Sequence, residues 1–137
     1  MYKRQQLHRY QATLRTCFTL ENFDNLIKNG RMRPIVGTLL RSLGIHIIAD
    51  ATAEGTIHVA DKARGVGKTY RAITALMKAS KDCTDAEVVI SHCENLEGAM
   101  ALKRQILADL PVKQVDLLSC RGLTSFYAME KGLIVGY

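Results

Sequence analysis

The sequence has little of what marks membrane, secreted or metal-binding chains. Its longest apolar runs, such as residues 45–49 interrupted by His46, fall far short of the roughly 18 residues that a membrane helix needs. The first residues are polar and basic, with no apolar segment of a secretory signal. The four cysteines form no Cys-x-x-Cys pair and no zinc spacing with the four histidines. We therefore expect reduced thiols, no metal, no membrane span and a cytoplasmic location.

The sequence also lacks internal repeats, low-complexity stretches and a linker rich in proline or glycine, and it has only two prolines. Its 137 residues match the length of one domain, given about 100–200 residues per domain. Apolar residues make up 47% and charged residues 23%, which is typical of globular proteins. We expect a domain over residues 14–137, preceded at residues 1–13 by an arm or the end of a helix.

Basic residues outnumber acidic ones by 19 to 13, and the excess of +6 equals the charge of one segment. Residues 62–81 contain no acid and six basic side chains, namely Lys62, Arg64, Lys68, Arg71, Lys78 and Lys81. Such a stripe is most often a solvated face, and it also suits an acidic partner protein. It carries no recognisable nucleic-acid-binding motif, so we expect no nucleic acid partner.

The first half of the chain predicts a strand, two short helices and a hairpin. Residues 14–20 alternate as in a half-buried strand, and the spacing from Phe23 to Ile27 is helical, with Gly30 as a C-cap. A second short helix is expected from Pro34, with an apolar face that includes Leu39 and Leu40. Residues 45–51 and 56–61 are rich in β-formers around a turn at 52–55, which predicts a hairpin. His46 and His58 are expected to form an outward-facing pair on it.

The second half alternates helices and strands. It predicts helices over residues 66–81 and 96–110, the second capped by Asn95 and stopped by Pro111. It predicts strands over residues 87–93, 112–119 and 132–137. Residues 121–131 are expected to form an irregular loop. The order predicts an α/β (α+β) sandwich, with a mixed β-sheet of about five or six strands and helices packed on it.

Two motifs resemble catalytic machinery. Residues 65–69 contain the Gly-Lys-Thr of a phosphate-binding P-loop, but position 62 holds Lys62 instead of the glycine that the full pattern requires. An enzyme acting on a phosphorylated small molecule or a nucleotide, using Gly67, Lys68, Thr69 and His92, therefore stays an alternative. His92 ends a strand just before Asn95, and a structural role in the turn is the simpler interpretation.

The segment 121–132 mixes hydroxyls, aromatic residues and glycines ahead of the last strand. Its hydroxyl groups can donate hydrogen bonds to a carboxylate while Phe126 and Met129 flank an apolar chain. A surface crossover that covers the edge of the sheet is an equally good interpretation.

The ordered set of segments resembles the C-terminal domain of the DegV family of bacterial lipid-binding proteins. Residues 18–32 resemble its Leu-x-x-Gly-Gly-Arg-Ile segment, and residues 90–97 are similar to its Ile-x-His-Ala-Asp-Asn segment. Residues 45–51, 55–57 and 62–64 resemble its Lys-Pro-Ile-Leu, Gly-x-Ile and Lys-Val-Arg segments. Their shared order spans about residues 14–137.

The resemblance implies a fatty-acid-binding protein without chemistry of its own and without a cofactor. In this family the acyl chain lies in a tunnel between two domains, and some members present the fatty acid carboxylate to a separate kinase subunit. The resemblance implies kinase contacts for Arg31 and Arg64. From the basic stripe we predict Lys68 and Arg71 as further residues that contact the partner. The alternative is that the stripe docks an acidic protein in a domain that binds no ligand.

The resemblance also implies a carboxylate site. Tyr127 takes the position of the histidine in the family's Gly-x-His-x-Gly-Pro-Gly loop, and a tyrosine hydroxyl can still donate to a carboxylate. We predict Ser125 and Thr124 as further ligands, with Phe126, Leu39 and Leu40 in the tunnel wall. The family's N-terminal domain has no counterpart in this sequence, so we expect a C-terminal half that binds lipid weakly or not at all by itself. We expect the apolar surface that faces the missing domain to be exposed or hidden by self-association.

Overall fold

The computed structural model describes residues 2–33 and 43–137. Within these ranges the elements are α1 (Tyr2–Thr13), β1 (Thr16–Leu20), α2 (Asp24–Lys28), β2 (Ile45–Ala51), β3 (Ile57–Arg64), α4 (Val66–Ser80), β4 (Glu87–His92), α5 (Leu96–Asp109), β5 (Gln114–Ser119), α6 (Gly122–Ala128) and β6 (Leu133–Gly136). The helix predicted from Pro34, including Leu39 and Leu40, lies outside the described residues.

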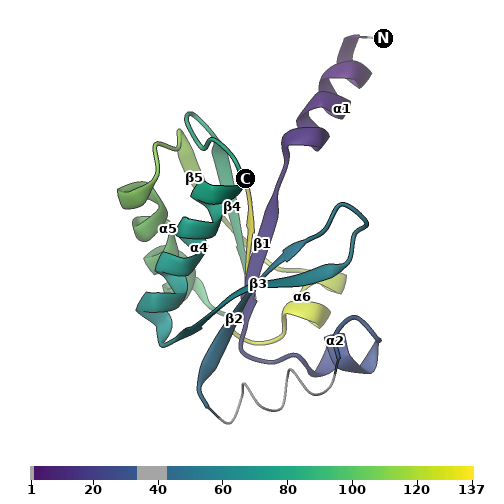
Figure 1. The fold of residues 1–137 in the computed structure, drawn as a ribbon, viewed down its shortest axis with the longest axis vertical. Helices are drawn as coiled ribbons and strands as arrows, with labels where there is room; N and C mark the ends of the chain where they lie inside the picture. Colours follow the sequence, from purple (N-terminus) through teal and green to yellow (C-terminus); the bar gives the residue numbers. More distant parts are fainter. Residues whose placement is uncertain (1, 34–42) are drawn as a thin grey trace.

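The strands of the described ranges form one mixed sheet in the order β3-β2-β1-β6-β4-β5. The β4–β5 pair is parallel and the other pairs are antiparallel. The last strand, β6, lies between β1 and β4 and so joins the hairpin half of the sheet to the half with alternating helices (Figure 1). This confirms the predicted mixed sheet, and six strands fall within the expected number.

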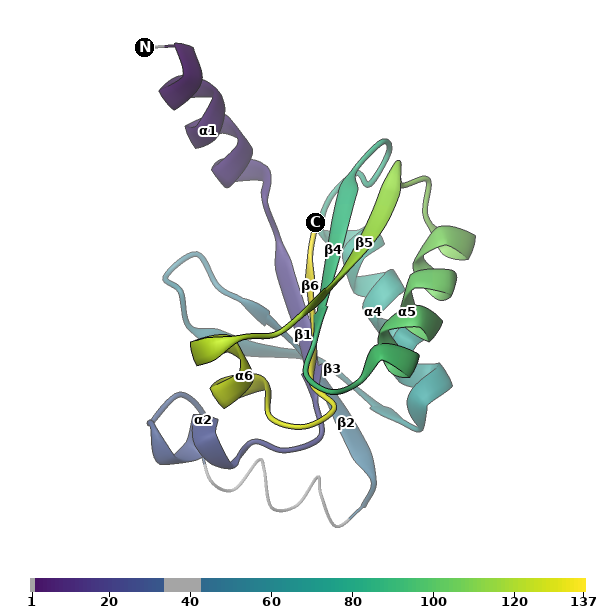
Figure 2. The same ribbon diagram turned by 180° about the vertical axis from the view of Figure 1, so that it is seen from behind.

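Two apolar layers cover the two faces of this sheet. On the first face, α4 and α5 pack on a core that includes Ile48, Ile73, Met77 and Leu102. On the second face, α2 and α6 cover a smaller core around Leu20, Leu26 and Ala128. The two helix layers lie on opposite sides of the sheet in both ribbon views (Figures 1 and 2).

The long helices on the first face follow the predicted patterns. Tyr70, Ile73 and Met77 of α4 are buried at helical spacing, and the Asn95 side chain accepts a hydrogen bond from the Gly98 N–H at the start of α5. The Thr74 hydroxyl of α4 donates to the Asp109 carboxylate of α5 over 2.8 Å. This bond ties the two helices together beside the core.

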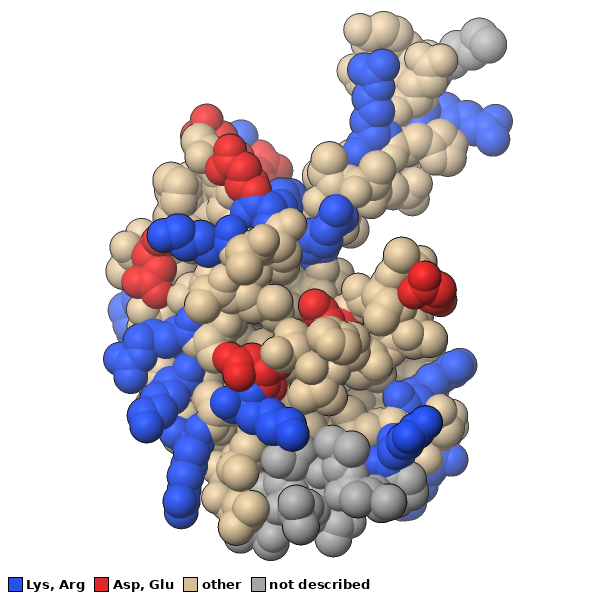
Figure 3. Space-filling view, viewed as in Figure 1, with Lys and Arg blue, Asp and Glu red and all other residues tan. Residues whose placement is uncertain are grey.

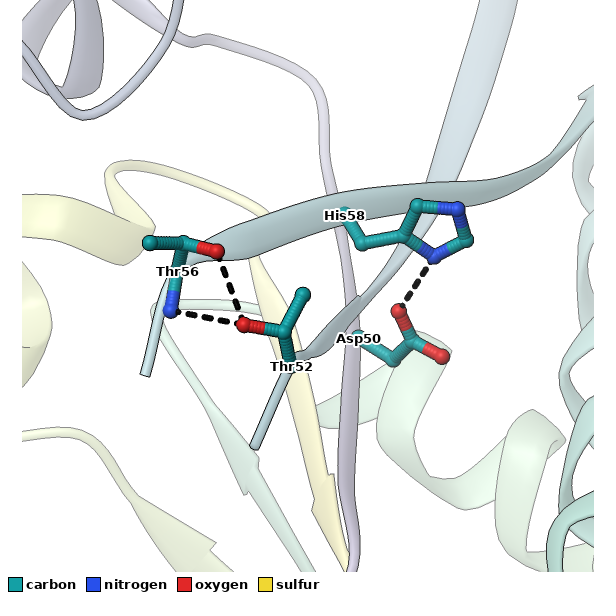
Figure 4. Close-up of polar contacts among 4 residues, drawn as sticks. All are labelled: Asp50, Thr52, Thr56 and His58. Carbon is teal, nitrogen blue, oxygen red and sulfur yellow. Dashed lines mark hydrogen bonds and ion pairs between the residues drawn. The ribbon is translucent and has the colours of Figure 1, made fainter. Parts of the chain in front are cut away.

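The β2–β3 hairpin ends in a turn stabilised by threonine hydroxyls (Figure 4). The Thr52 and Thr56 hydroxyl oxygens lie 2.8 Å apart, and Gly55 takes a φ of +76°, which favours glycine. The predicted pair of His46 and His58 is wrong. A register irregularity between Ile48 and Ala49 places His58 opposite Asp50, whose carboxylate lies 2.9 Å from His58 Nδ1, whereas His46 lies opposite Ala63.

Two further segments differ from the sequence-based interpretation in instructive ways. Residues 122–128, predicted as an irregular loop, form helix α6, because Ala128 and Tyr127 pack on the second face and supply the burial that a weak helix needs. Strand β3 continues to Arg64, three residues beyond the predicted end at Asp61. Its alternating contacts with β2 outweigh the polar composition of that end.

Residues 2–13 form helix α1, which stands away from the rest of the described chain (Figures 1 and 2). All its described side chains are exposed, including Tyr2, Leu7 and Tyr10. Residues 1–13 were expected to form an arm or the end of a helix, and residues 2–13 are helical. Among the helices described, none has the length and apolarity that crossing a bilayer requires.

Candidate functional site

An apolar hollow of about 200 Å³ opens on the second face of the sheet. Its walls come from the strands beneath and from α2 and α6 beside it, through Phe18, Leu20, Leu26, Ile57, Tyr127, Ala128 and Ile134. Among these lining residues, Tyr127 alone carries a polar side-chain group. The hollow therefore suits a hydrocarbon chain with a polar group near the Tyr127 hydroxyl.

The two-residue period of β1 builds the floor of this hollow. Phe18 and Leu20 point to the second face, whereas Cys17 and the buried Thr19 point toward α4. Ile134 of β6 lies directly opposite Phe18 in the antiparallel register. Strand alternation thus places apolar side chains from neighbouring strands side by side.

Helices α2 and α6 are fixed to each other beside the hollow. The Asn25 Nδ2 of α2 donates to the Phe126 carbonyl oxygen of α6 over 2.6 Å. The rings of Phe126 and Tyr127 pack edge to face, with centroids 5.1 Å apart. These contacts orient the helix segment that carries Tyr127.

The predicted ligand residues of α6 divide between the hollow and the surface. Tyr127 is half-buried and lines the hollow, whereas Thr124 is exposed, Ser125 is half-buried and Phe126 is 46% exposed. In the described ranges, no hydrogen bond engages the side-chain hydroxyls of Thr124, Ser125 or Tyr127, so all three are available to a ligand.

The predicted partner residues are all exposed but come from two places. Arg64 ends β3, and Lys68 and Arg71 lie on α4. Figure 3 shows Lys and Arg side chains along the side of the molecule where α4 lies. Arg31 instead follows α2, and its N–H donates to the carbonyl of Leu26, which packs on the second face of the sheet, over 2.8 Å.

The Gly-Lys-Thr motif lies at the start of α4 without the loop of a P-loop. Gly65 is the single residue between β3 and α4, which leaves no backbone to wrap around a chain of phosphates. The Thr69 hydroxyl is buried and donates to the Gly65 carbonyl over 3.0 Å. This geometry does not support the alternative of nucleotide-dependent catalysis.

His92 and the cysteines have structural surroundings. His92 is 9% exposed, and its Nδ1 accepts the Asn95 N–H over 3.4 Å, which supports the predicted role in the turn. All four cysteines are free, and burial together with the Asp50 charge raises the pKa of the Cys17 thiol to about 12. No group of three or more metal-ligating side chains occurs within residues 2–33 and 43–137.

Most residues that line the hollow were not predicted as site residues. Phe18, Leu20 and Ile57 lie in segments that carry the family resemblance, but neither they nor Ile134 carry a polar group that marks a site, and each alternates with residues of the opposite face. The signal available in the sequence was the period of two at Phe18 and Leu20, but strand order was needed to bring Ile134 beside them.

The family model and the curated relatives that this chain matches name the same family. The family model described as "Uncharacterised protein, DegV family" matches residues 3–133. A DegV domain-containing protein of Streptococcus gordonii is 32% identical over 134 residues, which are 97% of this chain and 47% of that protein. A second one, from Streptococcus pneumoniae, is 34% identical over 93% of this chain and 45% of its own length.

Solved structures share the fold. A DegV family protein from Eubacterium eligens, loaded with heptadecanoic acid, superposes with a TM-score of 0.88 at 27% identity, over 96% of this chain and 48% of that one. The Streptococcus pneumoniae fatty acid kinase B3 protein, loaded with linoleic acid, gives a TM-score of 0.87 at 33% identity, over 97% and 47%.

The fold and the hollow define an α/β domain with an apolar site on one face of its sheet. The chain belongs to the DegV family. It spans about half the length of the curated relatives it matches.

Proposed function

We propose that this chain binds the acyl chain of a long-chain fatty acid along the second face of its sheet and has no chemistry of its own. The observation that carries the proposal is the apolar hollow, in whose described lining Tyr127 is the single residue with a polar side-chain group. The similarity to proteins loaded with heptadecanoic and linoleic acids supports it.

The size of the hollow supports a shared site. Its volume of about 200 Å³ lies below the range of about 300–1,000 Å³ that encloses most ligands. Leu123 and Phe126 of α6 are 71% and 46% exposed beside it. Each buried CH₂ contributes about 0.8 kcal/mol, so full affinity requires a second apolar surface over the acyl chain. We propose that further protein, or self-association, supplies that surface.

Mass spectrometry of the purified chain, under native conditions and after lipid extraction, tests the proposal. We expect the extract to contain less than one fatty acid molecule per chain. If native mass spectrometry detects a dimer, we expect that dimer to carry one fatty acid per chain. An empty protein that also fails to take up oleic acid in a titration would contradict acyl binding.

Two variants test the proposed positions. Ile57→Trp fills the hollow and should abolish fatty acid uptake, whereas His58→Trp places the same ring on the next, 61% exposed side chain and should retain it. Tyr127→Phe should weaken binding about tenfold if its hydroxyl holds the carboxylate. Tyr10→Phe, exposed on α1, is the matched control. Equal affinities of Tyr127→Phe and Tyr10→Phe would remove the carboxylate role, and Thr124 and Ser125 would be tested next.

We further propose that a separate kinase subunit receives the fatty acid, with contacts from Arg31, Arg64, Lys68 and Arg71. The exposure of these four cationic side chains supports an electrostatic interface. Reversing charge with Arg64→Glu and Lys68→Glu should abolish binding to a fatty acid kinase subunit and leave lipid content unchanged. The same reversal at Lys103 and Arg104 of α5 is the control. Equal kinase binding in both variants would refute the docking role.

A further inference from the structure

A second, polar recess lies on the first face, where three neighbouring strands meet the start of α4. Thr19 of β1 lies opposite Ile48 of β2 and Leu133 of β6, and His46 of β2 points to the same face as Ile48. Glu21, just after β1, and Lys131, just before β6, complete this edge of the recess. The recess is lined by Thr19, Leu20, Glu21, His46, Val66, Thr69, Tyr70, Asn95, Lys131 and Leu133. Its volume of about 20 Å³ is room for one oxygen atom.

The hydroxyl of Thr19 lacks a partner in this recess. Thr19 is 6% exposed, and its Oγ1 is buried without a hydrogen bond to any described residue. A buried hydroxyl without a hydrogen bond destabilises the folded state, and such a group calls for an explanation. An oxygen of a bound group in the recess would accept this hydrogen bond.

The start of α4 adds positive potential at the same place. Intrahelical bonding begins with the Thr69 N–H donating to the Gly65 carbonyl, so the N–H groups of the preceding residues of the helix have no acceptor within it. Gly65 provides no capping side chain, and the first turn of α4 contains no acid. Helix α5, by contrast, is capped by Asn95 and has Glu97 in its first turn. The positive end of the α4 dipole is therefore left without a counter-charge from its own helix.

We propose that this recess and the start of α4 bind a single phosphoryl group. One phosphoryl oxygen enters the recess and accepts the Thr19 hydroxyl, while the others face the α4 N–H groups and the Lys131 ammonium. The carboxylate of Glu21 lines the same recess and opposes the anion, so binding is weak. The one-residue connection at Gly65 offers nothing for further phosphates, so a nucleotide gains no affinity from its length.

The recess opens on the opposite face of the sheet from the fatty acid hollow, although Leu20 lines both. Titration of the whole chain with inorganic phosphate, followed by amide NMR shifts at constant ionic strength, tests the proposal. We expect saturable shifts of the amides at residues 66–69 and of Thr19, and none with equivalent chloride. Methyl phosphate should cause the same shifts as inorganic phosphate. If lysophosphatidic acid causes the shifts and the two small phosphates do not, the ligand is a lipid and not a free phosphoryl group. Shifts absent or equal with chloride would overturn the proposal.

Three variants separate the site from general effects. Thr19→Val should weaken phosphate binding about tenfold while the protein stays as stable or becomes more stable, because the unpartnered hydroxyl is removed. Glu21→Gln should strengthen binding about threefold through loss of the opposing charge. Thr74→Val removes a buried threonine hydroxyl that is already bonded to Asp109 and should leave phosphate affinity unchanged. Unchanged affinity in Thr19→Val would contradict the assignment.

Discussion

Asn25 and Phe126, 101 residues apart in the sequence, are joined by a 2.6 Å hydrogen bond from the Asn25 side chain to the Phe126 carbonyl. The bond connects the two short helices beside the apolar hollow. Neither α2 nor α6 is long enough to be stable alone, so each depends on such tertiary contacts.

We predict that Asn25→Ala loosens α6. The change removes the bond to Phe126, and amide hydrogen exchange of residues 122–128 should become faster. Asn29→Ala is the control, because the Asn29 side chain donates only to the Asn25 carbonyl one turn earlier in the chain. Equal exchange rates in the two variants would show that the α2–α6 bond is not what holds α6.

We predict that the two faces of the hairpin contribute unequally to stability. Ile48→Ala opens a cavity in the fully buried first face and should lower the free energy of unfolding by about 2–5 kcal/mol. Ile57→Ala enlarges a hollow that is already open and should cost about 1 kcal/mol. Urea denaturation of both variants measures the difference, and a larger loss in Ile57→Ala would contradict it.

We predict that Asn95 stabilises the chain mainly as the cap of α5. Asn95→Ala removes the oxygen that accepts the Gly98 N–H and should cost about 1 kcal/mol. Asn95→Asp keeps that acceptor but loses the bond from Asn95 Nδ2 to the Lys131 carbonyl. Thermal unfolding should place Asn95→Asp between wild type and Asn95→Ala; equal melting temperatures of the two variants would assign the effect to the Lys131 contact.

We predict a loss of stability at alkaline pH. Burial raises the pKa of Cys17 from 9.0 and that of Tyr137 from 10.0, each to about 12 in the folded chain. In the unfolded chain these groups ionise at their ordinary pKa, so their contribution is full below pH 9 and is lost as pH rises toward 12. Urea unfolding at pH 8, 9.5 and 11 should show this fall, and Cys17→Ala should reduce its slope. A slope unchanged in Cys17→Ala would exclude the thiol as its cause.

Much of the secondary structure could be predicted because its signals are local. The spacing of Tyr70, Ile73 and Met77 predicts α4, and Asn95 marks the start of α5 within one residue. The fold class followed from the order of these elements, and the family from several short segments in the expected order.

Helix α6 and the partner of His58 could not be predicted in the same way. The first depends on burial of Ala128 against a strand far away in the sequence, and the second on a register irregularity between β2 and β3. Both are decided by pairing between segments, which single-segment patterns do not contain.

The sequence by itself determined the long helices, the core of most strands and the basic stripe, since each rests on residues close together in the chain, and it determined the family through short segments in a shared order. Only the tertiary structure decided that Tyr127 faces the same hollow as Phe18 and Ile134, and that the buried Thr19 lies at the start of α4. The physical reason is the insertion of β6 between β1 and β4: strand order sets which side chains share a face, and it arises from burial summed over the whole sheet.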